Sequence, residues 1–318
     1  MPKRIASIDQ FRGYAIASMI LVNSLGHFDA MPWMLKHHDT GFSYADLVAP
    51  VFIFVVGMGF RMSFWRRAGQ EGPWAARKST ARRYCILVGL GMLYGGFQFR
   101  AGVWDALTDI GLSGLLALFF IDRGPRIRLG MAAAYLSAYQ LIYSLTGYGE
   151  WVMDHSMNGG PLGPLSWVVI LLLGSVAQDI LATRDGRRIA IGCLAWGLGL
   201  TVAGWILSEP WPDVKASWPF SAPGMTAPYP LFSAGLAFLI YLGFHLLCDR
   251  AEVQIPHLSV MGKNPLVLYL LQAALVLIGR VTPSSAPVPV AISQFLVIYL
   301  ACYATARYLD HKGIVVKV

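Results

Sequence analysis

A short polar segment between two apolar runs holds the side chains best suited to chemistry. Residues 36–41 include His37 and His38, and Asp46 stands at the start of the run that follows. A neutral imidazole can take up a proton near neutral pH or attack an activated acyl group. A carboxylate such as Asp46 could fix the tautomer of that imidazole. Because these groups are costly to keep beside long apolar runs, they predict a functional site.

Further polar side chains fall inside the apolar runs themselves. Asn23 lies about one turn before the end of the first run, and His27 shares its helix face because it is four residues further on. An amide in hydrocarbon is unfavourable without a hydrogen-bond partner. A catalytic alternative is that it donates to an oxyanion that develops during a reaction. Asp105 and Asp109 place two carboxylates on one face of a later run. Spacing alone leaves open whether these groups form one catalytic pocket or hold helices together.

The chain as a whole is too apolar for a soluble protein. Of its 318 residues, 56% are hydrophobic and 13% are charged, whereas a soluble domain carries about 25% charged residues. A helix that crosses a bilayer needs roughly 17–25 mostly apolar residues. We therefore expect an all-α, polytopic membrane helix bundle of about ten spans, forming a single domain over residues 1–318. The predicted spans are 11–28, 45–65, 84–99, 104–122, 129–147, 165–183, 188–208, 230–249, 264–281 and 288–308.

The net charge of +8 is distributed as a topology signal, which argues against a nucleic-acid partner. Of the 25 lysines and arginines, 21 fall in alternate connections between the predicted spans and at the two termini. By the positive-inside rule, both termini are then cytoplasmic and His37 and His38 face the opposite side. Asp9 and Arg12 interrupt the start of the first run, so we expect that run to be a retained span, not a cleaved signal peptide.

Other residues are candidates for contact with an anionic ligand on the cytoplasmic side. Asp9 and Arg12 are spaced to form an ion pair that orients the first span. Lys263 and Asn264 precede Pro265, and this order fits a helix start with Asn264 as N-cap. The alternative is a contact from this helix start to a phosphate or an adenine. The four cysteines are far apart in the sequence, so we expect neither a metal site nor a disulfide framework.

Several stretches resemble the catalytic membrane domain of heparan-α-glucosaminide N-acetyltransferase and its bacterial relatives. They include Ser7-Ile8-Asp9-Gln10-Phe11-Arg12-Gly13, Val22-Asn23, Leu35-Lys36-His37, the run from Ala45-Asp46 to Gly57, and Gly262-Lys263-Asn264-Pro265-Leu266. The similarity covers most of the chain and is most specific over residues 7–60. We expect the chain to lack the large lumenal N-terminal segment of the animal enzyme.

The resemblance implies a transmembrane acyltransferase. In that family an acetyl group from cytosolic acetyl-CoA is delivered to an amino sugar on the far side of the membrane. The motif places the catalytic histidine at His37 and an assisting asparagine at Asn23. His38 would replace His37 if the loop were shifted by one residue. Asp46 would orient the loop or the imidazole.

For the donor and the partners we make the following expectations. Acetyl-CoA is the co-substrate, with Arg12, Lys263 and Asn264 as its contacts, and no metal takes part. The partners are a sugar or glycan acceptor, the lipid bilayer and, as one assembly to test, a second copy of the chain. The resemblance to bacterial members implies a multi-pass protein of the bacterial inner (plasma) membrane.

One departure from the family pattern concerns charge. Where the family often has an arginine, this chain has Asp109, within Leu107-Thr108-Asp109-Ile110. A reversed charge predicts a different acceptor or a different way of holding CoA. The alternative function is a proton-coupled transporter or flippase that uses the same polar residues.

Overall fold

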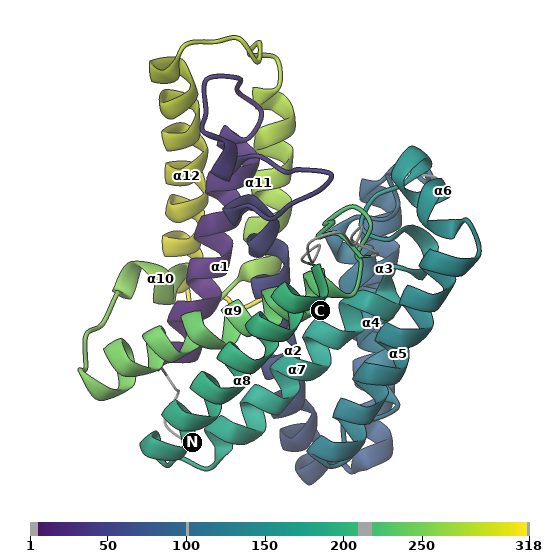
Figure 1. Cartoon of the computed structure of the whole chain (residues 1–318). Coiled ribbons are helices and arrows are strands. Elements are labelled where there is room, and N and C mark those ends of the chain that lie inside the picture. The colour runs from purple at the N-terminus through teal and green to yellow at the C-terminus, as the bar shows by residue number, and fades with distance from the viewer. Residues whose placement is uncertain (1–5, 100–101, 209–217, 317–318) are drawn as a thin grey trace. The chain divides into compact units, whose positions relative to one another are not determined.

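The regular structure is helical throughout the described part of the chain. The computed structural model describes residues 6–99, 102–208 and 218–316, and these contain helices and connecting turns (Figure 1). The prediction of an all-α protein is confirmed for these residues. The chain forms two compact units, and the prediction of one acyltransferase domain stays a prediction. Of the described residues, unit 1 comprises 6–38, 43–52 and 240–316, and unit 2 comprises 39–42, 53–99, 102–208 and 218–239.

Unit 1 is built around its first helix, α1 (Ala6–Leu25). A close approach fixes α1 against α10: a Cβ at Gly13 would lie 1.9 Å from the carbonyl oxygen of Leu258. The backbones can therefore approach this closely only because residue 13 is a glycine. The remaining elements of unit 1 are the 3₁₀ turn η1 (Trp33–Leu35), the start of α2 (Tyr44–Glu71), the end of α9 (Pro228–Phe244), the π-helical η3 (His245–Arg250), α10 (Pro256–Met261), α11 (Pro265–Gly279) and α12 (Val288–His311).

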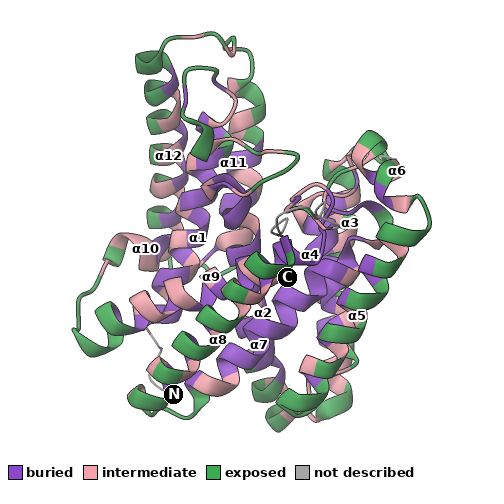
Figure 2. Ribbon diagram, viewed as in Figure 1, coloured by how far each residue is buried: buried purple, intermediate pink, exposed green. Residues whose placement is uncertain are grey.

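Unit 2 is built around α7 (Pro164–Ala182), whose residues are almost all buried (Figure 2). A helix that is apolar on all sides belongs in the interior of a bundle. Helices α4, α5 and α8 pack against α7, and α3 packs against α4. The bounds are α3 (Pro73–Tyr94), α4 (Ala106–Leu118), α5 (Pro125–Leu145), α6 (Tyr148–His155), η2 (Gly160–Leu162) and α8 (Gly186–Ser208), together with most of α2 and α9.

Two glycines set the contact between α2 and α7 within unit 2. A Cβ at Gly57 would lie 2.0 Å from the Leu171 carbonyl oxygen, and a Cβ at Gly174 would lie 2.1 Å from the Phe54 carbonyl oxygen. Small residues that let helix backbones approach closely are the usual device of membrane bundles.

We predict that Gly174→Ala destabilises the protein. The added methyl group meets backbone, which must shift, and overpacking of this kind costs about 1–3 kcal/mol. Thermal unfolding of the purified protein measures the effect. Gly199→Ala on α8 is the matched control, because a Cβ there meets nothing within 4 Å. A loss of stability no larger than in the control would show that the two helices can separate at no cost.

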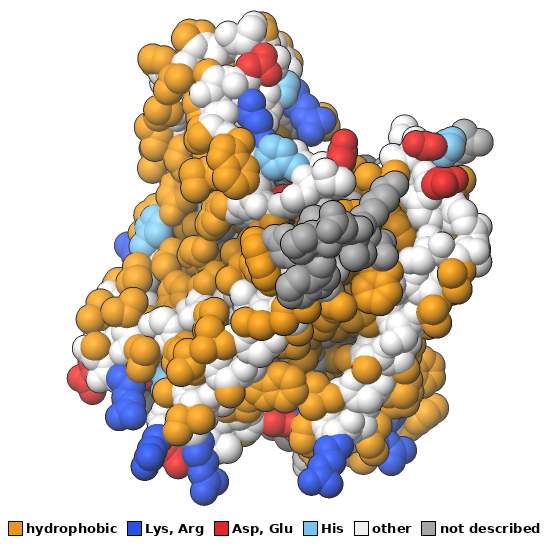
Figure 3. Space-filling model, viewed as in Figure 1, with side chains coloured by type: hydrophobic (Ala, Val, Ile, Leu, Met, Phe, Trp, Pro, Cys, Tyr) orange, Lys and Arg blue, Asp and Glu red, His pale blue; other side chains and the backbone are white. Residues whose placement is uncertain are grey.

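Five helices of the described chain are long and apolar enough to cross a membrane. They are Tyr44–Glu71, Gly160–Ala182, Gly186–Ser208, Pro228–Arg250 and Val288–His311, and two shorter apolar helices are Ala106–Leu118 and Pro265–Gly279. Large apolar side chains are exposed on α8 and α12, including Leu198, Val202, Val297 and Leu300, and apolar side chains cover much of the visible surface (Figure 3). Such a surface suits lipid. The number of about ten spans and the cytoplasmic position of both termini stay predictions.

Residues 66–83, which connect the predicted spans 45–65 and 84–99, are helical except at Gly72. Helix α2 continues to Glu71 and α3 begins at Pro73, so only Gly72 separates them. Gly72 has a φ of 88°, which suits glycine, and a proline is favourable at the first position of a helix. The predicted span 84–99 is thus the second half of a longer helix that ends at Tyr94. Part of the predicted outer connection, residues 209–217, lies outside the described residues.

Candidate functional site

The start of α2 holds Asp46 in place through a capping box. Ser43 precedes the helix, and its hydroxyl accepts a hydrogen bond from the Asp46 backbone N–H at 3.3 Å. In return the Asp46 carboxylate accepts from the Ser43 backbone N–H at 2.9 Å. A serine followed three residues later by an acidic residue is a recognised signal for a helix start. The Asp46 side chain is fully buried as a result.

His37 is the histidine that contacts this carboxylate. Its Nδ1 lies 2.9 Å from Asp46 Oδ1, while 62% of the His37 side chain is exposed. With Nδ1–H donating to the carboxylate, Nε2 carries the lone pair. The pair therefore combines a fixed, buried carboxylate with an exposed basic nitrogen, which is the arrangement of a general base or a nucleophile. The contact predicted between His37 and Asp46 is present in the structure.

The loop that carries His37 is anchored on unit 1. Phe28 is fully buried in an apolar cluster with Leu25, Met31 and Ala291. The Asp29 backbone N–H donates to the Ser284 carbonyl oxygen at 2.9 Å. These contacts tie the start of the loop to neighbouring elements, and the capping box of Ser43 and Asp46 holds its end. The position of the imidazole therefore does not depend on the loop alone.

The two neighbouring histidines have other partners. His38 contacts the Trp33 carbonyl oxygen through Nε2 at 3.0 Å and lies against the Trp33 ring. His27 contacts the Thr282 carbonyl oxygen at 3.2 Å. The geometry around Asp46 thus favours His37 over both as the catalytic candidate.

Asn23 has a partner that the sequence gave no reason to expect. Its Nδ2 donates to Oε1 of Gln272 on α11 at 3.3 Å, and Gln272 is buried. Asn23 itself is exposed. Because Gln272 Oε1 accepts this hydrogen bond, the orientation of the Asn23 side-chain amide is fixed. The second hydrogen on Asn23 Nδ2 remains available to donate to another acceptor.

For the acyl transfer that the resemblance implies, we predict that Gln272→Leu lowers kcat about tenfold with little change in the KM for the donor. Without the Gln272 carbonyl the Asn23 amide can rotate, and one hydrogen bond to a developing charge is worth roughly 1–3 kcal/mol. Steady-state kinetics of the purified protein measure both constants. Gln272→Glu keeps the acceptor oxygen and is the rescue variant. Equal kcat values for Gln272→Leu and the parent would mean that Asn23 needs no orienting partner.

The three residues predicted to contact acetyl-CoA all lie in unit 1, and each has contacts within the chain. Arg12 is 3.4 Å from Asp9, as the spacing predicted, and it also donates to the Gly262 carbonyl oxygen. Lys263 pairs with Asp310.

Asn264 stands at the N-cap position of α11, but its side chain does not cap the helix. Its Nδ2 donates to the Ile314 carbonyl oxygen at 3.0 Å, and its Oδ1 accepts from the Val316 N–H at 2.8 Å. Asn264 therefore holds the segment that follows α12. A role for it in binding a donor stays a prediction.

A second histidine–carboxylate pair lies in unit 1, and sequence analysis missed it. His245 Nδ1 is 3.0 Å from Asp249 Oδ2, which also accepts from the Ser7 hydroxyl at 2.6 Å. Gln10, from the same motif as Ser7, accepts from the Ile255 N–H at 3.1 Å. The sequence could have predicted this contact, because His245 and Asp249 are four residues apart near the end of a predicted span and therefore share a helix face. This network explains why Ser7 and Gln10 are buried although they are polar.

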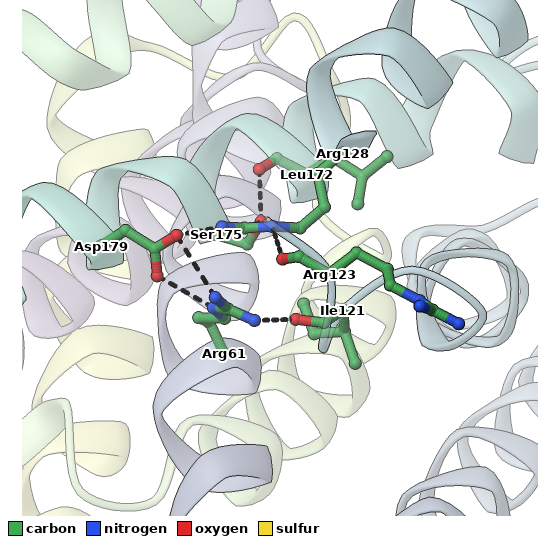
Figure 4. Close-up of polar contacts among 7 residues, drawn as sticks. All are labelled: Arg61, Ile121, Arg123, Arg128, Leu172, Ser175 and Asp179. Atoms are coloured by element: carbon green, nitrogen blue, oxygen red, sulfur yellow. Dashed lines mark hydrogen bonds and ion pairs between the residues drawn. The ribbon is translucent and has the colours of Figure 1, made fainter. Parts of the chain in front are cut away.

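In unit 2, two arginines share one aspartate (Figure 4). Arg61 Nε lies 2.9 Å from Asp179 Oδ1, and Arg128 pairs with Asp179 Oδ2. Arg128 also donates to the Ser175 hydroxyl at 2.5 Å, and Arg61 to the Ile121 carbonyl oxygen. The cluster joins α2, α5 and α7. Sequence analysis did not single it out, although Arg61 and Asp179 both fall inside predicted spans.

The carboxylates Asp105 and Asp109 also belong to unit 2. Asp105 is the N-cap of α4, and its side chain accepts from the Leu107 N–H. Asp109 is completely buried in the first turn. No group of three or more His, Cys, Asp or Glu side chains in the part of the chain that the structure describes is arranged to hold a metal ion.

These features define a class: a helical membrane protein in which the loop between α1 and α2 carries a histidine–carboxylate pair. Residues 4–192, more than half of the chain, match the family model of the heparan-alpha-glucosaminide N-acetyltransferase catalytic region, so the chain belongs to that family. The match includes Asn23, His37 and Asp46 and ends before Lys263. Membership indicates a membrane acetyltransferase.

Two curated relatives are similar over shorter stretches. Human heparan-alpha-glucosaminide N-acetyltransferase is 39% identical over 64 residues, which cover 20% of this chain and 9% of the human protein. A protein of Bacillus acidopullulyticus, described as an uncharacterised 39.9 kDa protein in the amylase 3' region, is 33% identical over 135 residues. These cover 41% of this chain and 37% of the relative. The similarity thus spans well under two thirds of either relative.

Proposed function

We propose that the protein is a membrane-bound acyltransferase that moves an acetyl group from acetyl-CoA to an amino sugar or another glycan acceptor. The observation that carries the proposal is the contact of 2.9 Å between His37 Nδ1 and Asp46 Oδ1, on a side chain that is 62% exposed. With Nδ1–H donating to Asp46, the lone pair of the imidazole is on Nε2. Membership of the family supports the reaction class. Acetyl-CoA, the acceptor and the mechanism are parts of the proposal.

The reaction steps follow from the direction of the hydrogen bond between His37 and Asp46, in which Nδ1–H donates to the carboxylate and Nε2 is left as the base. As the acceptor nitrogen or oxygen attacks the thioester carbonyl carbon, His37 Nε2 takes the proton from the acceptor. The buried Asp46 carboxylate stabilises the imidazolium that results. The free N–H of Asn23 donates to the carbonyl oxygen as negative charge develops on it. When the carbon–sulfur bond breaks, the imidazolium returns the proton to the leaving thiolate.

A second route uses the same atoms in two steps. His37 Nε2 attacks the thioester carbonyl carbon, the carbon–sulfur bond breaks and CoA leaves as the thiolate. The acyl-imidazolium, whose Nδ1–H is held by Asp46, then transfers the acetyl group to the acceptor; the Nε2 lone pair is restored and the proton of the acceptor passes to water. Thiol release from acetyl-CoA without acceptor, at one equivalent of protein, distinguishes this route from direct transfer.

The supply of the donor completes the proposal. Acetyl-CoA approaches from the cytoplasmic side, where Arg12, Lys263 and Asn264 contact its phosphates or adenine. The acceptor approaches from the other side of a bacterial inner membrane, the side on which the charge bias of the connections predicts His37 to lie. A homodimer is the assembly to test.

The deciding experiment measures thioester consumption by the protein in proteoliposomes. Acetyl-CoA and longer acyl-CoA donors are supplied with a panel of amino sugars and other glycans, and the product is identified by mass. We expect thiol release that depends on one class of acceptor. If no acceptor gives acyl transfer while a solute or a proton crosses the membrane, the transporter or flippase function replaces this proposal.

A further inference from the structure

One face of helix α3 in unit 2 is open over nearly its whole length. At about 100° per residue, every exposed residue of the stretch 74–93 falls within roughly 120° around the helix axis. These residues are Trp74, Lys78, Arg82, Cys85, Ile86, Gly89 and Leu93. The buried residues of α3 lie on the opposite side, and α3 packs against α4. We call the exposed set the open face of α3.

Two cations lie near the start of the open face. Lys78 and Arg82 are exposed, and neither side chain makes a hydrogen bond or an ion pair with a described residue. By contrast, the neighbouring Arg77 donates to the Asp122 carboxylate at 2.6 Å. The sequence has a single acidic residue, Glu71, between positions 47 and 104. The two cations of the open face are therefore not used for packing, and they are available to an outside partner.

Beyond Arg82 the open face is apolar. Ile86 is 39% exposed and Leu93 is 65% exposed. Between them a Cβ at Gly89 would meet nothing within 4 Å, so there is room beside the backbone. This apolar strip from Ile86 to Leu93 runs for about 10 Å along the helix axis. Large apolar side chains exposed in a row suit hydrocarbon and not water.

The start of the open face carries an indole. Trp74 lies one turn before Lys78 and is 79% exposed. A tryptophan ring with its single N–H donor is favourable at the boundary between hydrocarbon and water. The open face thus combines an interfacial ring, two cations and an apolar strip, in this order. Water alone does not suit the ring and the strip, and hydrocarbon alone does not suit the cations.

An anionic phospholipid has the parts that match this order. Lys78 and Arg82 are four residues apart, about 6 Å along the axis, so both can contact one phosphate group. Side chains on a helix tilt toward its N-terminus, which carries these two charges away from the apolar strip. An acyl chain of the same lipid can then follow the strip. A soluble phosphate would use the cations but would leave the strip and the ring exposed.

The predicted topology agrees with this occupant. The charge bias of the connections predicts that the start of α3 lies at the cytoplasmic surface of the membrane. The cytoplasmic leaflet carries a negative surface potential, and each lysine or arginine near it adds to the attraction. Charge complementarity therefore favours an anionic lipid over a zwitterionic one.

We propose that the open face of α3 is a binding site for one anionic phospholipid. Lys78 and Arg82 hold its phosphate, Trp74 lies beside its headgroup, and one acyl chain runs along the strip from Ile86 to Leu93. The site uses none of the residues assigned to acyl transfer, so the inference does not rest on the proposed function.

Thermal unfolding of the purified protein in detergent micelles tests the proposal without any turnover. Dioleoylphosphatidylglycerol or its zwitterionic counterpart, dioleoylphosphatidylcholine, is added in increasing mole fraction at constant ionic strength. We expect phosphatidylglycerol to raise the Tm of the parent protein by about 2 °C or more, with saturation, and phosphatidylcholine to have little effect. The double variant Lys78→Gln with Arg82→Gln is expected to lose the difference between the two lipids.

A matched control separates a defined site from general attraction between charges. Arg126→Gln with Arg187→Gln removes the same two charges from other exposed positions of unit 2, and it is expected to respond as the parent does. Equal losses in the two double variants would mean that phosphatidylglycerol is attracted by the basic surface as a whole, which overturns the proposal.

Soluble anions form the last arm of the experiment. Inorganic phosphate and CoA are expected to leave the Tm unchanged, and an increase with either one that depends on Lys78 and Arg82 would replace the lipid by a soluble ligand. The proposal is also overturned if the two lipids act equally on the parent. Should the double variant fail to fold, Lys78→Gln and Arg82→Gln are measured singly, and full responses in both overturn it as well.

Discussion

Replacement of His37 by alanine is expected to lower kcat for acyl transfer by about 10²–10⁴-fold, the usual contribution of a general acid or base. The same replacement at His38 is expected to leave kcat within a few-fold of the parent. The reason is that His37 contacts the buried Asp46 carboxylate, whereas His38 contacts a backbone carbonyl oxygen. Steady-state thioester consumption by the two variants measures the difference.

Two further measurements separate loss of chemistry from loss of structure. The His37 side chain is 62% exposed, so its removal should leave the Tm nearly unchanged. The exposed position should also allow free imidazole in the assay to restore part of the activity of His37→Ala. Full activity of His37→Ala, together with loss of activity in His38→Ala, would transfer the catalytic role to His38.

The contact between His37 and Asp46 could be predicted because both residues belong to one short loop and the helix that it enters. The capping box of Ser43 and Asp46 spans only four consecutive residues, so it can be recognised from the sequence. Its two hydrogen bonds explain why the position of the Asp46 carboxylate is fixed. Short-range sequence patterns of this kind can be interpreted without knowledge of the fold. They could also have revealed His245 and Asp249, which are four residues apart.

Contacts between distant parts of the chain could not be predicted in this way. Gln272 is 249 residues from Asn23, and nothing in its apolar surroundings marks it as the partner of an amide. The N-cap position of Asn264 was readable, but its hydrogen bonds to the segment after α12 depend on where that segment returns. Hydropathy finds apolar runs and not their partners, and it does not show that the basic stretch before residue 84 belongs to the same helix, α3.

Asp179→Asn is expected to destabilise the protein by about 3–5 kcal/mol, the usual effect of leaving a buried charge without its partner. Asp179 is the one carboxylate shared by Arg61 and Arg128, and Arg128 is completely buried (Figure 4). The Tm and the yield of folded protein measure the effect. Asp185→Asn is the control, because its pair with Arg188 is exposed and such pairs contribute about 0–1 kcal/mol.

A triple variant shows whether the cluster serves stability alone. Replacing Arg61 and Arg128 by methionine and Asp179 by leucine removes every charge together, and apolar replacements of buried ion clusters are often neutral or stabilising. We expect the triple variant to be more stable than Asp179→Asn, because no guanidinium is then left uncompensated. A triple variant as unstable as the single one would mean that the hydrogen bonds to Ser175 and Ile121, and not charge balance, hold α2, α5 and α7 together. A triple variant that is stable but inactive would assign the two arginines a part in the reaction.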